Sequence, residues 1–474
     1  MAVFEYYVPP KEITAAQDLV AFADQAKEAE AAQATGIVVS TAWTVTINGI
    51  GIPVLATPVT FRGPHHFCQV RYTVEPCPLT FFVRNRDHRS LRVRAKDCFI
   101  PSVPKDGGIE FTYAGEGQLT LEADGIPDAP LSIFVSARET EPPERGDPDI
   151  IWFGPGLHLV QRLELRDGQT VYLENGALLR AIPPEPSETP VIEDDWAHVP
   201  EYTDFITAFG KKKITIRGMG IIETTQLPWH ARRTIYLEDC EDIRIEGILA
   251  VGPAHWTVVP YHCERVRIHD VKVFGYRTNS DGIDLVNCKD VSVSGCYLRT
   301  GDDAVCLKGM LSPDVPGGEN VRVCDCTIWT EKARSLGIIG ETRGDFQNIV
   351  FENCLVLHGY ANWTRELGAL CIVLSDGGTV RDVVFRNIEI IQEASWVIDC
   401  MIRPDFWSTD QKPGHIQDIL FENIRVPQDA RINLEGFDPG HLVEKIGLNC
   451  VTNEHGEELL TIQKNNFARM ITFR

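Results

Sequence analysis

The sequence predicts an all-β protein in which a small N-terminal β-sandwich domain with one helix precedes a right-handed parallel β-helix. Three observations predict this class. Short apolar strands recur at intervals of about 23 to 36 residues in the C-terminal two thirds, alternating runs with a hairpin turn occupy the first third, and no long helical periodicity follows the first third. We place the N-terminal helix and sandwich in residues 1–147 and the β-helix in residues 148–474.

The first expected element is a helix over residues 14–35. Thr14 and Gln17 have the spacing of a capping box, and the segment between them and Gly36 is rich in alanine. Glycine frequently ends helices, so Gly36 is the expected end. These signals predict one helix ahead of the strands.

The period changes to two after this helix. Trp43, Val45 and Ile47 alternate with threonines, and Asn48-Gly49 is a typical hairpin turn. Similar runs continue to residue 137, so we expect a β-sandwich over residues 37–137. The polar, proline-rich stretch 138–149 reads as a linker.

The remainder of the chain repeats. Eight short strands each contain an apolar residue near their start, which we call the anchor. Two residues after each anchor stands a second apolar residue: Ile216, Ile245, Ile268, Val293, Val323, Phe351, Phe385 and Phe421. Seven residues after each anchor stands a third: Ile221, Ala250, Val273, Leu298, Ile328, Val356, Ile390 and Val426. Coils stacked about 4.8 Å apart would bury these positions as continuous columns. This pattern predicts the parallel β-helix.

Cysteines occupy the same columns. Cys296, Cys326 and Cys354 share a position with Ile and Val in other coils, so we expect them to be reduced and buried as small hydrophobic residues. The chain has 14 cysteines but neither a C-x-x-C pair nor zinc-type spacing. No metal and no cofactor are expected.

Composition limits the partners. The 474 residues are 43% hydrophobic and 24% charged, with a net charge of −22, which argues against nucleic acid and anionic membranes. No run of about 18 apolar residues and no secretory signal is seen, which favours a cytoplasmic location unless a leader precedes this sequence. The sequence leaves open whether the chain forms a homo-oligomer.

One position of the repeat carries charged side chains. Aligning the coils on Val258, Ile283, Val305 and Leu336 places one residue from each coil in a single column, two positions earlier: Trp256, Asp281, Asp303 and Arg334, with Asp302 beside Asp303. One such aspartate is more often a turn residue, but three with Trp and Arg are better explained as a cleft wall. Carboxylates one coil apart raise each other's pKa, as acid/base cleavage of a glycosidic bond requires.

The segment TNSDGIDLVNCKDVSVSGCYLRTGDDAVCLKG (278–309) resembles the polygalacturonases of glycoside hydrolase family 28, and HWTVVPYHCERVRIHDV (255–271) is similar to the strand before their active site. WFGPGLHLVQRLELRDGQTVYLENGALLRA (152–181) also looks like the dextranase-like enzymes of family 49. The resemblance covers about residues 150–430.

The resemblance implies inverting hydrolysis by three aspartates. Asp302 would be the general acid, and Asp281 and Asp303 together the base that activates water. Asn279 and Lys308 match residues of the family's motif, and the resemblance implies a substrate-side or supporting role for Asp284. Separation of the carboxylates by one coil would by itself lean towards retention, so inversion is expected on the resemblance alone.

The sequence also departs from the family. Arg334 stands where the family has a histidine, and LCIVL (370–374) replaces the basic residues implied to bind a uronate. We therefore expect an oligo- or polysaccharide substrate that is neutral rather than galacturonic, bound with help from Trp256, Arg334 and Glu341. Two other classes stay open: a β-helix lyase, epimerase or intramolecular glycosyl transferase, and a non-catalytic carbohydrate-binding protein.

Overall fold

The computed structural model describes residues 3–14, 36–60, 62–87, 90–96, 98–193, 199–359, 368–391, 396–404, 408–453, 455–457 and 461–473. The predicted helix over residues 14–35 lies almost wholly outside these ranges. Within them every regular element is a strand, and no helix could cross a membrane. The all-β prediction is confirmed for this part of the chain.

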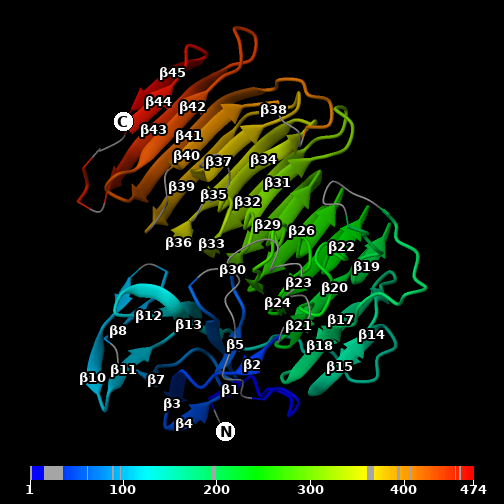
Figure 1. Cartoon of the computed structure of the whole chain (residues 1–474), viewed down its shortest axis with the longest axis vertical. Helices are drawn as coiled ribbons and strands as arrows, with labels where there is room; N and C mark the ends of the chain where they lie inside the picture. Colours follow the sequence, from blue (N-terminus) through cyan, green and yellow to red (C-terminus); the bar gives the residue numbers. More distant parts are fainter. Residues whose placement is uncertain are drawn as a thin grey trace.

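The N-terminal strands form two antiparallel-rich sheets (Figure 1). One contains β1 (Phe4–Tyr6), β2 (Val38–Val39), β5 (Leu55–Thr57), β6 (His65–Tyr72), β8 (Leu91–Arg94), β9 (Phe99–Ile100), β12 (Gly117–Ala123) and β13 (Ile126–Ser136). The other contains β3 (Trp43–Ile47), β4 (Ile50–Ile52), β7 (Leu79–Asn85), β10 (Ser102–Lys105) and β11 (Gly108–Tyr113). Alternate residues of both sheets bury one shared apolar core, as a sandwich requires.

The predicted hairpin is present between β3 and β4. Asn48 and Gly49 have φ of 49° and 80°, the left-handed pair that a type I′ turn needs. Gly49 accepts this conformation without steric cost because it has no Cβ. Val45 pairs with Ile52, so the alternation in the sequence becomes the inward face of this sheet.

From residue 150 the chain winds into parallel coils that form two sheets. The larger contains β14 (Ile150–Phe153), β15 (Gly156–Val160), β17 (Thr170–Leu173), β18 (Ala177–Ala181), β20 (Thr215–Gly218), β21 (Ile221–Glu223), β23 (Glu241–Glu246), β24 (Leu249–Val251), β26 (Glu264–His269), β27 (Lys272–Phe274), β29 (Cys288–Ser294), β30 (Tyr297–Thr300), β32 (Gly318–Cys324), β33 (Thr327–Thr330), β35 (Phe346–Glu352), β36 (Leu355–Gly359), β38 (Thr379–Val380), β39 (Val383–Ile390), β41 (His415–Val426), β43 (Val443–Asn453) and β45 (Ala468–Phe473). Parallel crossovers of this kind are right-handed.

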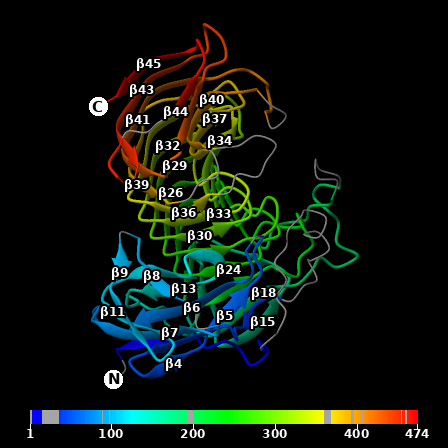
Figure 2. The same cartoon turned by 60° about the vertical axis from the view of Figure 1, so that its left-hand side comes forward.

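The second sheet, which we call the site sheet, takes one strand from each coil. It contains β16 (Leu163–Glu164), β19 (Ile206–Phe209), β22 (Ile235–Glu238), β25 (Val258–Tyr261), β28 (Ile283–Val286), β31 (Val305–Gly309), β34 (Leu336–Thr342), β37 (Gly368–Leu374), β40 (Trp396–Ile402), β42 (Arg431–Glu435) and β44 (Thr461–Lys464). Its strands lie in chain order along the β-helix (Figure 1), and Figure 2 shows β34, β37 and β40 stacked one above the other.

The predicted repeat register is confirmed. The second apolar column pairs in register through all eight coils, from Ile216 with Ile245 to Phe385 with Phe421. The prediction for the third column is wrong at one position, because Ile222 rather than Ile221 pairs with Ala250. Ile221 packs instead in the cluster that joins the two domains.

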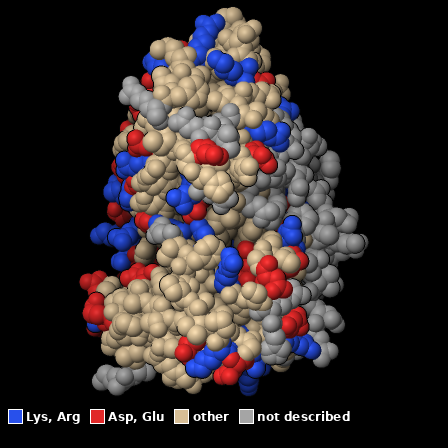
Figure 3. All heavy atoms as spheres, turned by 90° about the vertical axis from the view of Figure 1, so that its left-hand side faces the viewer, with Lys and Arg blue, Asp and Glu red and all other residues tan. Residues whose placement is uncertain are grey.

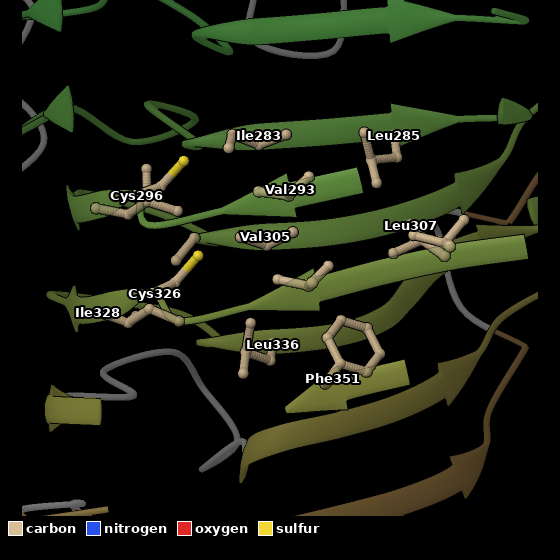
Figure 4. Packing of buried hydrophobic residues seen from close by; sticks show 14 of the residues in the cluster. Ile283, Leu285, Val293, Cys296, Val305, Leu307, Cys326, Ile328, Leu336 and Phe351 are labelled. Carbon is tan, nitrogen blue, oxygen red and sulfur yellow. The ribbon is translucent and has the colours of Figure 1, made fainter. Parts of the chain in front are cut away.

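Figure 4 shows this interior, where Ile283, Val305 and Leu336 stack with Cys296 and Cys326. The cysteines of the columns are free and buried, as predicted.

The sandwich lies against the first half of the β-helix, beside β24 and β30, and the last coils extend beyond it (Figure 1). Apolar side chains of β6 and β13, including Phe67 and Phe134, pack on Phe274, Tyr297 and Trp329 of the larger sheet. Positive and negative side chains are interspersed over the face that Figure 3 presents.

Candidate active site

The predicted column is present at the entry to the site sheet. Val258 pairs with Ile283, Ile283 with Val305 and Val305 with Leu336. The residues two positions earlier therefore stand on adjacent coils, as the sequence predicts: Trp256, Asp281, Asp303 and Arg334. We call this set the entry column.

The entry column includes two coils before Trp256 that the sequence did not predict to belong to it. Ile206 pairs with Ile235 and Ile235 with Val258, so Asp204 and Arg233 occupy the same position in the two preceding coils. The guanidinium of Arg233 lies 3.3 Å from Asp204 Oδ2 and 5.6 Å from the ring of Trp256. Aligning Ile235 with Val258 in the sequence would have placed Arg233 in the entry column, because Arg233 stands two positions before Ile235.

A cavity of about 270 Å³ lies over the entry column. Eight of the nine predicted site residues line it: Trp256, Asn279, Asp281, Asp302, Asp303, Lys308, Arg334 and Glu341. The ninth, Asp284, is fully buried on the next outward position of β28 and lies behind this wall. Its carboxylate accepts a hydrogen bond from the thiol of Cys306 at 2.8 Å.

Asp302 and Asp303 reach the same cavity because residues 301–304 bend instead of continuing a strand. In an extended strand the two side chains would point to opposite faces. The Asp302 carboxylate accepts two backbone N–H groups, from Asn279 at 3.0 Å and from Asp303 at 3.1 Å. Asn279 thus fixes Asp302 through its main chain, at a φ of 58°.

Burial raises the pKa of three carboxyl groups of the site, Asp281, Asp284 and Asp302. Burial, followed by the charge of Asp303, raises the pKa of Asp302 to about 6. Burial also raises the pKa of Asp284 to about 7, and burial with the charges of Asp284 and Asp302 raises the pKa of Asp281 well above its usual value.

Arg334 is the cation of the acid cluster. Its Nη1 lies 3.3 Å from both carboxylate oxygens of Asp303, and its backbone N–H donates to the same carboxylate at 2.9 Å. Burial lowers the pKa of Arg334, but the charge of Asp303 outweighs this effect and the pKa lies above its usual value. Asp303 is therefore held in place as the partner of a permanent cation.

Lys308 lies on the other side of the cavity. Its Nζ donates to Glu341 at 3.1 Å and lies 5.0 Å from the centre of the Trp256 ring. Burial lowers the pKa of Lys308, but Glu341 and the neighbouring aspartates outweigh it, so the pKa is raised well above its usual value. Lys308 thus donates to Glu341, and its charge also lowers the pKa of Asp281, Asp284 and Asp302 against the effect of burial.

Four further residues with polar or charged side chains line the cavity, and the sequence did not predict them: Glu201, His230, Arg233 and His255. His230 and His255 stack with ring centroids 3.8 Å apart. Glu201 comes from the connection between β18 and β19, which has no repeat pattern to reveal it.

The sandwich domain supports the turns that carry the aspartates. Thr60 donates to the carbonyl of Tyr276 at 2.7 Å, just before Asn279. Arg299, at the end of β30 and three residues before Asp302, contacts His65 of β6 at 2.6 Å and forms a fully buried ion pair with Glu331. The two domains are thus tied together beneath the turns that carry Asn279, Asp281 and Asp302.

The comparisons with known proteins confirm the predicted resemblance. Residues 222–438 match the model of "Glycosyl hydrolases family 28". A relative named "Probable exopolygalacturonase B" from Aspergillus flavus is 26% identical over 246 residues, which are 46% of this chain and 54% of that protein. Across the curated relatives that it matches, the chain spans 31% to 54% of their length.

Two solved structures share the fold. Dex49A from Penicillium minioluteum has a TM-score of 0.62 at 12% identity, with 98% of this chain and 99% of that chain covered. A polygalacturonase from Erwinia carotovora ssp. carotovora has a TM-score of 0.54 at 17% identity and covers 67% of this chain and 86% of its own. The predicted fold class and the distant similarity to the family 49 group are confirmed.

Proposed function

We propose that the protein hydrolyses a glycosidic bond with inversion, using Asp302 as acid and Asp281 with Asp303 as base. The match of residues 222–438 to the family 28 model supports this proposal. The observation that carries this proposal is the entry column. It sets Asp281 and Asp303 on adjacent coils and holds Asp302 beside them in one cavity.

Asp302 is the acid because it can keep its proton to a higher pH than an ordinary aspartate. Burial and the negative charge of Asp303 raise its pKa to about 6, whereas an exposed aspartate loses its proton near pH 4. The two backbone N–H groups hold its carboxyl group in one orientation. A fixed carboxylic acid with such a pKa can donate its proton to a departing sugar oxygen.

Asp281 and Asp303 form the base. A carboxylate oxygen of each lies within 4.8 Å of the other, which lets one water molecule hydrogen-bond to both. Asp303 faces the guanidinium of Arg334 and carries the charge that accepts the proton. Asp281, which lies against Asp284, orients the water as it attacks.

The charges of the cavity favour a neutral sugar over a uronate. Each cation on the wall already faces a carboxylate: Arg334 with Asp303, Lys308 with Glu341, and Arg233 with Asp204. A uronate carboxylate would have to compete with these partners and would also meet the remaining aspartates, at a cost in desolvation and repulsion. The names of the curated relatives make galacturonan the second candidate.

Hydrolysis of a panel of α- and β-linked neutral and uronic oligosaccharides tests the proposal, with the anomer of fresh product followed by NMR. We expect turnover of a neutral substrate, inverted product, and a loss of about 10³-fold or more in kcat for Asp302→Asn. The exposed Asp242→Asn is the matched control and should keep full activity.

Three results would contradict the proposal. Turnover of galacturonan alone would contradict the neutral substrate. A product that absorbs in the ultraviolet would indicate a lyase. Sugar binding that survives Asp302→Asn, with no turnover by the wild type, would indicate a binding protein.

A further inference from the structure

Glu201, His230 and His255 form a polar cluster on the wall of the same cavity, away from the aspartates. The three side chains are at least nine-tenths buried, with exposed fractions of 6%, 1% and 4%. His230 Nδ1 lies 3.1 Å and His255 Nε2 lies 3.6 Å from the same oxygen of Glu201. The proposed acid and base make no use of this cluster.

The backbone fixes the proton of His255. The N–H of Trp256 donates to His255 Nδ1 at 2.7 Å, so the proton of the neutral ring is on Nε2, which faces Glu201. A metal ion would need the lone pair of this Nε2. The cluster therefore presents an N–H donor beside a carboxylate acceptor, which is the pairing that a sugar hydroxyl can satisfy in both directions.

The charge of Glu201 is well supported. Although burial raises its pKa, the contacts with His230 and His255 outweigh this effect and hold the pKa of Glu201 below its usual range. Arg233 Nη2 lies 3.7 Å from its other oxygen. The 3.6 Å between His255 Nε2 and Glu201 exceeds a normal hydrogen bond, so the pair can accept a hydroxyl without giving up a strong contact.

The position of the cluster fits a sugar next to the reacting bond. His255 and His230 precede β25 and β22, the first and second strands before β28, whose entry carries Asp281. With adjacent strands about 4.8 Å apart, the cluster lies roughly 5–10 Å from Asp281 along the β-helix axis. That distance corresponds to about one sugar residue.

Two residues that pair through their backbones line this end of the cavity. Glu201 pairs with Ile192 in an isolated antiparallel bridge, and both residues line the cavity. A cavity of about 270 Å³ is at the small end for ligand sites and suits a single sugar ring better than a continuous chain. A polysaccharide would therefore meet a wall beyond the sugar that contacts Glu201.

We propose that Glu201, His230 and His255 form a subsite for the terminal sugar of the substrate, and that the enzyme consequently releases sugars from a chain end. This inference rests on the proposed function. In the subsite, one hydroxyl of the terminal sugar donates to Glu201 and accepts from His255 Nε2–H. Arg233 is a positioning residue, which holds Glu201 and stacks on Trp256.

The test compares four forms of the neutral oligosaccharide that the wild type hydrolyses. In the first both ends are free, in the second the non-reducing end is methylated, in the third the reducing end is reduced, and in the fourth both ends are modified. Variants are Glu201→Gln and His255→Phe, with Glu241→Gln as an exposed control on the other sheet. Products are followed from the first few per cent of conversion.

We expect the wild type to release one small product from the start and to lose at least 10-fold in kcat/KM when one particular end is modified. For the substrate with free ends, Glu201→Gln and His255→Phe should raise KM about 10–100-fold. For the substrate modified at the sensitive end, whose kcat/KM is already low, the same substitutions should cause little further loss of kcat/KM. Products of many lengths from the wild type, or an equal loss on all substrates, would overturn the subsite. A metal ion bound stoichiometrically by the wild type and lost in Glu201→Gln would replace it with a metal site.

If the wild type hydrolyses nothing, the proposed function fails and binding decides the subsite. Neutral disaccharides would be titrated into the wild type and Glu201→Gln, with tryptophan fluorescence as the signal because Trp256 lines the cavity. A Kd at least 10-fold weaker in Glu201→Gln for a disaccharide with a free end supports the subsite. Equal affinity, or no binding to the wild type, contradicts it.

Discussion

The replacement of Arg334 by methionine separates the two effects that this residue has on the acid cluster. The guanidinium holds Asp303 through contacts of 3.3 Å to both carboxylate oxygens, and its charge lowers the pKa of Asp302 against the effects of burial and of Asp303. Methionine fills a similar volume without the charge. The backbone N–H of residue 334 can still donate to Asp303.

The magnitude follows from the charge that is removed. An opposite charge within about 4–6 Å lowers a carboxyl pKa by about 1–3 units. Arg334 contacts Asp303 directly and Asp302 is the adjacent residue, so the low end of this range applies and the pKa of Asp302 should rise from about 6 to about 7. One unit corresponds to about 1.4 kcal/mol of lost stabilisation of the ionised Asp302.

The sign of the pH effect is set by the proposed role of Asp302 as the acid. Activity needs its proton, so kcat/KM should fall as the pH rises through about 6 in the wild type and through about 7 in Arg334→Met. Because the base loses its fixed partner, the maximal kcat should also fall, by about 10–100-fold.

The assay is kcat/KM from pH 4 to pH 9 on the substrate identified by the panel. Arg334→Lys is the matched control, since it keeps the charge but not the contact with both oxygens of Asp303. In Arg334→Lys, kcat/KM should still fall as the pH rises through about 6, while kcat decreases. The reasoning is refuted if the pH of this fall does not move in Arg334→Met, or if it moves equally in Arg334→Lys.

Two further predictions concern the support of the site and its aromatic wall. Glu331→Gln removes the charge of a carboxylate that is fully buried against Arg299, so the free energy of unfolding should fall by about 3–5 kcal/mol in urea titrations. An unchanged midpoint would show that this ion pair does not stabilise the fold. Trp256→Ala removes the ring that contacts Lys308 and Arg233. We expect KM to rise by about 10-fold or more, with a smaller change in kcat. An unchanged KM would exclude the ring from sugar binding.

The sequence determined the coil register and, with it, the centre of the site. Side chains of a strand alternate strictly, and a shift by one residue would expose a whole apolar column, so the buried positions fix how each coil pairs with the next. For this reason the alignment of Ile283 with Val305 was sufficient to place Asp281 beside Asp303. The one register error, at Ile221, arose where the sandwich domain supplies a second apolar surface for that side chain to pack on.

The tertiary structure decided what the register does not control. The bend that turns Asp302 towards Asp303, the pairing of Lys308 with Glu341 and the position of Glu201 depend on turns and connections, where no periodicity constrains the chain. The docking of the sandwich beneath the catalytic turns joins His65 to Arg299 across 234 residues. Such contacts form between surfaces that exist only after each domain has folded, and local patterns in the sequence therefore carry no record of them.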